Sequence, residues 1–129
     1  MLLLSCKKER LDSYVWKELH VKATAYNSII YQTNSKPFIA AWGDTLQPGM
    51  KVIAVSNDLL KLGLKHNTPV KIKGLDSIYL VKDKMHSRKR KQIDIYMGTD
   101  LRKARKWGIK KVKIYYAILK SELPKDSIP

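Results

Sequence analysis

Strict alternation of apolar and polar positions is the clearest pattern along this chain. It begins at Val21, from which Val21, Ala23 and Ala25 alternate with more polar neighbours. A period of two is typical of a strand with one buried face. Further strands, rich in β-branched or aromatic residues and bounded by turn residues, are predicted at 51–56, 69–73, 78–83, 92–97 and 111–119.

Two short helices are expected between these strands. Asp58 is expected to cap a helical turn that runs to Leu64, because its carboxylate can accept a backbone N–H bond. A second helix is predicted from Thr99 as the N-cap to Gly108 as the stop. Its apolar stripe would consist of Leu101, Ala104 and Trp107.

Six short strands without a βαβ repeat predict a mainly β domain in the form of a small barrel. The chain has 129 residues, of which 44% are hydrophobic, enough for one core. We therefore expect one domain over residues 21–119, after a tether at 1–20 and before a flexible tail at 120–129. Residues 27–50, rich in polar residues with Pro and Gly, are predicted to form an ordered, functional loop.

The chain begins with Met-Leu-Leu-Leu-Ser-Cys, which resembles the end of a bacterial lipoprotein signal. In such signals the cysteine is lipidated, so Cys6 is the expected lipidation site. This anchor would hold the protein to a membrane of the bacterial cell envelope, on its periplasmic face. The apolar run is shorter than the roughly 7 to 15 residues of a secretory signal, and the alternative is an unmodified cysteine in an unstructured N-terminus.

Strong positive charge favours polyanionic partners. The chain has 26 Lys and Arg against 11 Asp and Glu, a net charge of +15. Nucleic acid, anionic lipid and an acidic cell-wall polymer all fit that charge. The basic run at 88–91 is interpreted either as a cationic rim for acidic ligands or as a solvated turn. Nucleic acid is not the expected partner, since neither a binding motif nor a set of stacking aromatics accompanies the run.

No metal or cofactor is expected. His20, His66 and His86 are scattered along the chain, without the paired spacing of a zinc site, and they lie near no cysteine.

Two aspartates are the candidates for chemistry. In strand 92–97 the apolar residues at 93, 95 and 97 share one face, so Asp94 and Tyr96 emerge on the other. Flanking β-branched residues desolvate Asp94, which raises a carboxyl pKa as a general acid requires. Asp83 ends the preceding strand, and like-charge repulsion between close acids raises one pKa. The alternative is that both aspartates cap turns or pair with lysines.

Several short runs, in order, resemble the three-aspartate (3D) domain family over residues 21–119. They are Ala-Thr-Ala-Tyr at 23–26, Trp-Gly-Asp at 42–44, Ile-Ala-Val-Ser at 53–56, Val-Lys-Asp at 81–83, Ile-Asp-Ile-Tyr at 93–96 and Ala-Arg-Lys-Trp-Gly at 104–108. The family includes the catalytic barrel of membrane-bound lytic transglycosylase A and the stationary-phase-survival proteins. The resemblance implies a six-stranded double-psi β-barrel with one or two short helices.

The resemblance also implies roles for single residues. Asp94 matches the acid that protonates the glycosidic oxygen between N-acetylmuramic acid and N-acetylglucosamine, and then acts as the base that helps form a 1,6-anhydro sugar. Asp83 would tune Asp94, and Asp58, two positions late, would be the third aspartate. The expected substrate-binding residues are Tyr26, Trp42, Lys84 and Tyr96, where the alternative for the aromatic residues is a place in the core.

One departure from the family affects the expected activity. The family commonly has Asp-Thr-Gly-Gly where this chain has Asp-Lys-Met-His at 83–86, and larger side chains there would narrow a cleft. The prediction is a monomeric peptidoglycan lytic transglycosylase. The alternatives are a non-catalytic glycan-binding module of the cell wall on the same barrel, and a basic nucleic-acid-binding domain.

Overall fold

A computed structural model of the chain describes residues 13–28 and 38–123. In chain order its elements are β1 (Tyr14–Tyr26), β2 (Phe38–Ile39), β3 (Thr45–Leu46), β4 (Val52–Val55), α3 (Asn57–Leu62), β5 (Pro69–Ile72), β6 (Ile78–Lys84), β7 (Gln92–Tyr96), α4 (Leu101–Trp107), β8 (Lys110–Leu119) and the 3-10 turn η1 (Lys120–Glu122). The expectation of a mainly β domain with short helices is confirmed.

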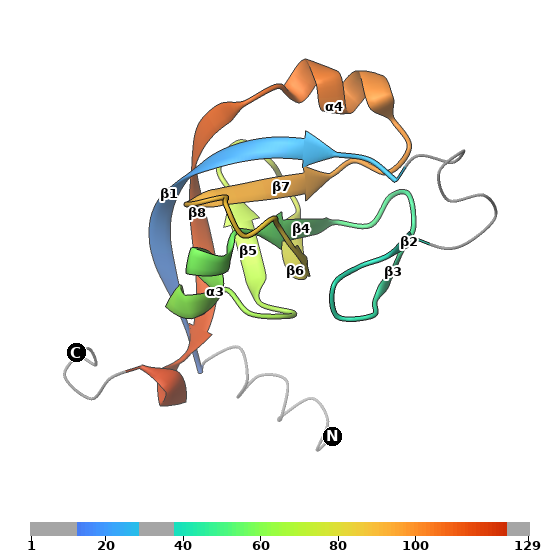
Figure 1. Ribbon diagram of the computed structural model, residues 1–129. Helices are drawn as coiled ribbons and strands as arrows, with labels where there is room; N and C mark the ends of the chain where they lie inside the picture. Colours follow the sequence, from blue (N-terminus) through green and yellow to red (C-terminus); the bar gives the residue numbers. More distant parts are fainter. Residues whose placement is uncertain (1–12, 29–37, 124–129) are drawn as a thin grey trace, which may run out of the picture.

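Six strands form a closed barrel in the order β1-β7-β4-β6-β5-β8, and β8 pairs back to β1 (Figure 1). The pairs β1–β7 and β4–β6 are parallel, and the others are antiparallel. Strands β2 and β3 form a separate two-stranded sheet, which we call the lobe, inside the segment predicted as a loop. Its strands have two residues each, too few for a period-two pattern to be recognised.

The barrel interior is filled by one side of each strand. Ile53, Val55, Ile93, Ile95 and Ile114 are all at most 1% exposed. The alternation predicted from Val21 is confirmed for Val21 and Ala23, which belong to the same core. A second, smaller core lies on the outer side of β4 and β7. It consists of Ala40, Leu46, Val52 and Tyr96, with Tyr26 and Met50 packed against them.

Strand β1 is longer than the pattern predicted. Residues 14–20, which were assigned to a tether, pair antiparallel with residues 113–119 of β8. Every second side chain of this stretch, including Glu18 and His20, lies on the outer face of the barrel, where Glu18 forms an ion pair with Lys113 at 3.5 Å. Because these outward side chains are polar or charged, the amino-acid composition of the stretch resembles that of a linker. Cys6, the rest of the predicted tether and residues 124–129 lie outside the described residues.

Both helices begin one or two residues from the expected positions. Helix α3 follows Ser56 at the N-cap position, so Asp58 lies in the first turn. The N-cap of α4 is Asp100 rather than Thr99, because the Asp100 carboxylate accepts the N–H of Lys103 at 2.9 Å. The predicted stop at Gly108 is confirmed.

Helix α4 closes one end of the barrel beyond β7 and β1 (Figure 1). Trp107 Nε1 donates to the Ala23 carbonyl oxygen of β1 at 3.2 Å and fixes the helix there. Only part of the expected apolar stripe is buried, since Leu101 is 48% exposed.

Residues 120–123 were predicted as the start of a flexible tail, but they form the 3-10 turn η1 and its C-cap. Glu122 of η1 forms an ion pair with Lys65. Among the described residues no helix is both long and apolar enough to cross a membrane.

Candidate functional site

The two predicted acids lie in one row of residues that crosses four strands. Thr24 of β1 pairs with Asp94 of β7, Asp94 pairs with Ala54 of β4, and Ala54 pairs with Asp83 of β6. Directly paired residues project from the same face of a sheet. The two aspartate backbones are separated by two strand spacings, about 10 Å, with Ala54 of β4 between them. The prediction that Asp94 faces away from its isoleucine neighbours is confirmed.

A β-bulge brings Asp83 to this face. Ile53 pairs with Val81 and Ala54 pairs with Asp83, so Lys82 is one residue too many in β6. Without the extra residue, Asp83 would follow the direction of Val81, which is fully buried in the core. The bulge turns both Lys82 and Asp83 outward. Two consecutive polar residues after an alternating run were the available sequence signal, and the sequence interpretation did not use it.

Asp94 is half-buried, and burial is the largest influence on its carboxyl group. Burial raises the pKa of Asp94. Thr24 Oγ1 donates to Oδ1 at 2.9 Å and lowers it, the Lys89 charge also lowers it, and the Asp83 charge raises it. The net result is a raised pKa for Asp94, the direction expected from the sequence. Burial contributes more to this shift than the second acid does.

Asp83 holds the lobe against the barrel. Its Oδ1 accepts the backbone N–H of Ala41, in the turn between β2 and β3, at 2.9 Å. The same oxygen accepts the N–H of Lys84 at 2.9 Å. These bonds place the β2–β3 turn directly beside the aspartate row.

The same turn carries Trp42, which stacks on His66. The two ring centroids are 4.9 Å apart at an interplanar angle of 30°. The Lys84 ammonium group lies 5.6 Å from the Trp42 ring centroid. Two of the predicted binding residues, Trp42 and Lys84, therefore lie together near Asp83. The sequence interpretation assigned no role to His66, since its position beside Trp42 depends on the packing of distant segments.

A polar cluster of Asp44, His66 and Lys82 holds His66 in place beside Trp42. Asp44 accepts a hydrogen bond from Lys82 at 3.3 Å and is bonded through Oδ2 to His66 Nε2. Burial raises the pKa of Asp44, but the bonds with His66 and Lys82 outweigh burial, so the pKa of Asp44 lies below its ordinary value. The cluster links the lobe to the α3–β5 connection and to β6.

Tyr26 and Tyr96 form part of the small outer core. They are register partners in β1 and β7, with ring centroids 5.4 Å apart. Tyr96 is 3% exposed, and its hydroxyl is hydrogen-bonded to Ser28 Oγ at 2.6 Å. Burial, and then the charges of Asp83 and Asp94, raise the pKa of Tyr26 well above its ordinary value. Tyr96 is a core residue here, whereas Tyr26 borders both carboxyl groups.

Asp58 lies apart from the aspartate row, at the start of α3. Its Oδ2 accepts the N–H of Lys91 at 2.8 Å, which joins α3 to the β6–β7 connection. Burial raises the pKa of Asp58, but hydrogen bonds from the Ser56 side chain and from backbone N–H groups outweigh it, so the pKa is lowered. The structure therefore does not bring the predicted third aspartate to the other two.

The basic run at 88–91 is exposed in the β6–β7 connection. Lys89 is near enough to Asp94 to lower the pKa of that carboxyl group. The described part of the chain contains no group of three His, Cys, Asp or Glu side chains that could hold a metal ion.

The fold defines a class, that of small six-stranded β-barrel domains. No family model and no curated protein matches the chain, so membership of the three-aspartate family is not confirmed. Solved structures do match, and they have double-psi-barrel-like folds.

Streptomyces papain inhibitor is 16% identical with a TM-score of 0.54, over 79% of this chain and 94% of that one. The apo expansin of Clavibacter michiganensis is 18% identical with a TM-score of 0.54, over 78% of this chain and 50% of that one. A mutant of that expansin in complex with cellohexaose is 17% identical, also with a TM-score of 0.54, over 84% and 54%. The chain thus spans about half the length of the expansin. At these identities the similarity is one of fold.

Proposed function

We propose that this domain is a double-psi β-barrel that binds glycan strands of the bacterial cell wall across the aspartate row. The observation that carries the proposal is that Asp83 and Asp94 flank the small Ala54 on one outward face. Carboxylates form strong hydrogen bonds, and sugar hydroxyl groups are ready donors to them. Ala54 itself is only 4% exposed, so the ligand would lie over the row and contact the partly exposed carboxyl groups on either side of it.

The surroundings of the row suit a sugar. Trp42 lies in the turn beside Asp83, and an aromatic ring next to a carboxylate can hold the apolar face of a sugar while its hydroxyl groups are bonded. The fold also supports a polysaccharide ligand, since the expansin mutant that matches 84% of this chain is in complex with cellohexaose.

Positive charge selects among polysaccharides. Lys84 lies next to Trp42, and Lys89 lies near Asp94. Together with the net charge of +15, these cations favour a glycan that carries carboxylates. Peptidoglycan, with its muramic acid and peptide carboxylates, meets that requirement and is the ligand we propose. Cys6 lies outside the described residues. A lipid anchor there would hold the domain to a membrane of the cell envelope, so that the domain faces the cell wall.

A second candidate function is lytic cleavage of the same ligand. The observation that favours it is the raised pKa of Asp94, which burial produces. A carboxyl group that keeps its proton can donate it to the glycosidic oxygen. The resulting carboxylate can then accept the proton of the muramic acid 6-hydroxyl as that oxygen bonds to the anomeric carbon. The products would be a 1,6-anhydro sugar and a chain with a free 4-hydroxyl group.

Purified peptidoglycan sacculi separate these functions. The full chain is incubated with sacculi, the bound fraction is measured after sedimentation, and soluble products are analysed by mass spectrometry. We expect the wild type to bind and Asp94→Asn to bind about tenfold more weakly, as loss of hydrogen bonds to a charged group implies. Asp76→Asn, which changes an exposed aspartate in the β5–β6 turn, should bind like the wild type.

The outcomes are distinct. Binding without soluble products supports a glycan-binding module. Release of anhydromuropeptides that stops in Asp94→Asn establishes cleavage. A wild-type protein that does not sediment with sacculi contradicts both functions, and salt-sensitive binding to DNA in its place would favour a nucleic-acid-binding domain.

A further inference from the structure

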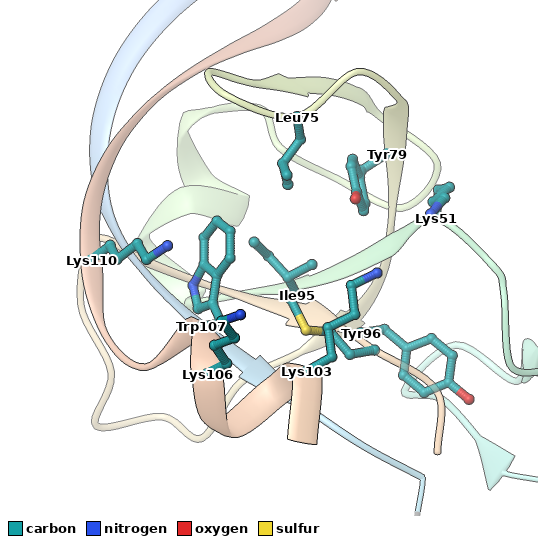
Figure 2. Close-up of a pocket in the computed structure, with 10 residues that line it drawn as sticks. Lys51, Leu75, Tyr79, Ile95, Tyr96, Lys103, Lys106, Trp107 and Lys110 are labelled. Atoms are coloured by element: carbon teal, nitrogen blue, oxygen red, sulfur yellow. The ribbon is translucent and has the colours of Figure 1, made fainter. Parts of the chain in front are cut away.

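A cavity of about 280 Å³ opens between α4 and the end of the barrel, where Ile95 and Tyr96 of β7 line it (Figure 2). Its inner wall is apolar. Ile95 comes from the inner row of β7, while Asp94 and its row lie on the outer face. The other apolar or aromatic residues that line the cavity are Leu75, Tyr79, Tyr96, Met97 and Trp107.

Four lysines line the cavity as well. Lys103 and Lys106 come from α4, Lys110 begins β8, and Lys51 precedes β4 on the opposite side. In Figure 2 the four lysines lie to the left of, below and to the right of the apolar side chains, with Leu75 and Tyr79 on the remaining side. No acidic residue is among the described residues that line it. The ion pairs formed within the described part of the chain involve other lysines, and the Lys110 ammonium group lies 4.1 Å from the Trp107 ring centroid.

This combination defines a ligand chemistry. Four ammonium groups with no carboxylate beside them repel one another. A bound anion relieves this repulsion, so the cavity favours a negatively charged ligand. The apolar wall excludes a fully hydrated ion and favours a ligand with an apolar part. The volume of about 280 Å³ is just below the roughly 300 to 1,000 Å³ of typical ligand pockets, which suits a small fused ring system or a short chain.

We propose that this cavity is a second binding site, for a small phosphate monoester or carboxylic acid with an apolar body. The anionic group would lie among Lys51, Lys103 and Lys106, and the apolar body would pack against Ile95 and Trp107. The site does not depend on the aspartate row, and it is independent of the proposed glycan ligand.

Calorimetric titration of the full chain with 1-naphthyl phosphate tests the site. We expect this probe to bind at least tenfold more tightly than 1-naphthol or inorganic phosphate at the same ionic strength, because each of those carries only half of the required chemistry. Equal affinity for inorganic phosphate would overturn the proposal, since it would mean that only net charge attracts the ligand.

A pair of double variants separates the site from the overall charge. Lys103→Gln with Lys106→Gln should weaken binding of 1-naphthyl phosphate at least tenfold. Lys61→Gln with Lys120→Gln removes the same charge from exposed positions on α3 and η1, and binding should change less than twofold. Similar losses in both double variants, or none in the first, would overturn the proposal. The four substituted lysines are all exposed, so both double variants should fold. Far-ultraviolet circular dichroism checks that they do.

Discussion

Removing the Thr24 hydroxyl group tests the electrostatic account of Asp94. In the wild type, Thr24 Oγ1 donates to Asp94 Oδ1 at 2.9 Å and accepts from Gln92 Nε2 at 3.0 Å. Thr24→Val keeps the branched shape and removes both bonds. Because the bond to Asp94 favours the carboxylate, its loss should raise the pKa of Asp94 further above the ordinary 3.8.

The magnitude follows from the charge on the acceptor. A hydrogen bond to a charged group contributes about 1.5 to 3 kcal/mol, and a neutral one about 0.5 to 1.5 kcal/mol. Above its folded pKa Asp94 is ionised and Thr24→Val loses the charged bond, whereas near pH 2 Asp94 is protonated and only neutral bonds are lost. The bond with Gln92 is lost equally in both ranges. The free energy of unfolding should therefore fall by about 1 kcal/mol more at pH 7 than at pH 2.

The sign agrees with proton linkage. Asp94 has a folded pKa above its unfolded value, so its contribution to stability is fully present below the unfolded pKa and is lost as pH rises through the folded pKa. Thr24→Val raises the folded pKa further and so deepens that loss at higher pH. Urea denaturation from pH 2 to pH 7 measures the difference, and carbon NMR of the Asp94 carboxyl group measures the pKa directly.

A matched variant isolates the effect. Thr68→Val makes the same change at a buried threonine that accepts from Lys65 N and donates to the Gly63 carbonyl oxygen. Its destabilisation should be the same at pH 2 and pH 7. A destabilisation by Thr24→Val that is independent of pH, or an Asp94 pKa that does not rise, would refute the reasoning.

Three further predictions concern the barrel and the lobe. Ile53→Ala, at a fully buried position, should lower the free energy of unfolding by about 2 to 5 kcal/mol in urea denaturation, and a loss under 1 kcal/mol would contradict the core assignment. Gly98→Ala places a Cβ 3.0 Å from Pro48 Cα at a φ of +57°, so its melting temperature should fall more than that of Gly74→Ala, where a Cβ meets nothing within 4 Å. Equal melting temperatures would contradict that close approach. The pKa of Asp44 is lowered in the folded state, so its stabilisation is present above the unfolded value near 3.8 and is lost as pH falls through the folded pKa. The free energies of unfolding of the wild type and Asp44→Asn should therefore converge as pH falls through that range. A constant difference between them would count against the Asp44 cluster.

Most strands of the barrel could be predicted from the sequence, because their alternation directly reflects burial. Strand 78–83 corresponds to β6, and strand 92–97 corresponds to β7. The first half of β1 could not be predicted in this way. Its outward side chains, such as Glu18 and His20, are polar or charged, and its partner β8 lies about a hundred residues away in the chain. Local composition therefore resembles a linker where the strand depends on non-local pairing.

In the candidate site, too, features set by the local pattern could be predicted and features set by distant pairing could not. The outward direction of Asp94 follows from a period of two within one strand. The direction of Asp83 depends on the bulge at Lys82, which arises from pairing with β4. The stacking of Trp42 on His66 depends on how the lobe packs against the barrel. The role of Asp58 as a third aspartate rested on the resemblance alone; in the structure Asp58 lies in the first turn of α3 and accepts the N–H of Lys91.

The most direct test of the central claim is a nitrogen-15 NMR titration of the labelled full chain with a soluble peptidoglycan glycan oligomer. Glycan binding across the aspartate row predicts the largest shift changes at the amides of Ala41, Ala54 and Asp94, and much weaker changes at the same glycan concentration in Asp94→Asn. Shift changes confined to α4 and the residues around Lys103, or no changes at all, would contradict the account.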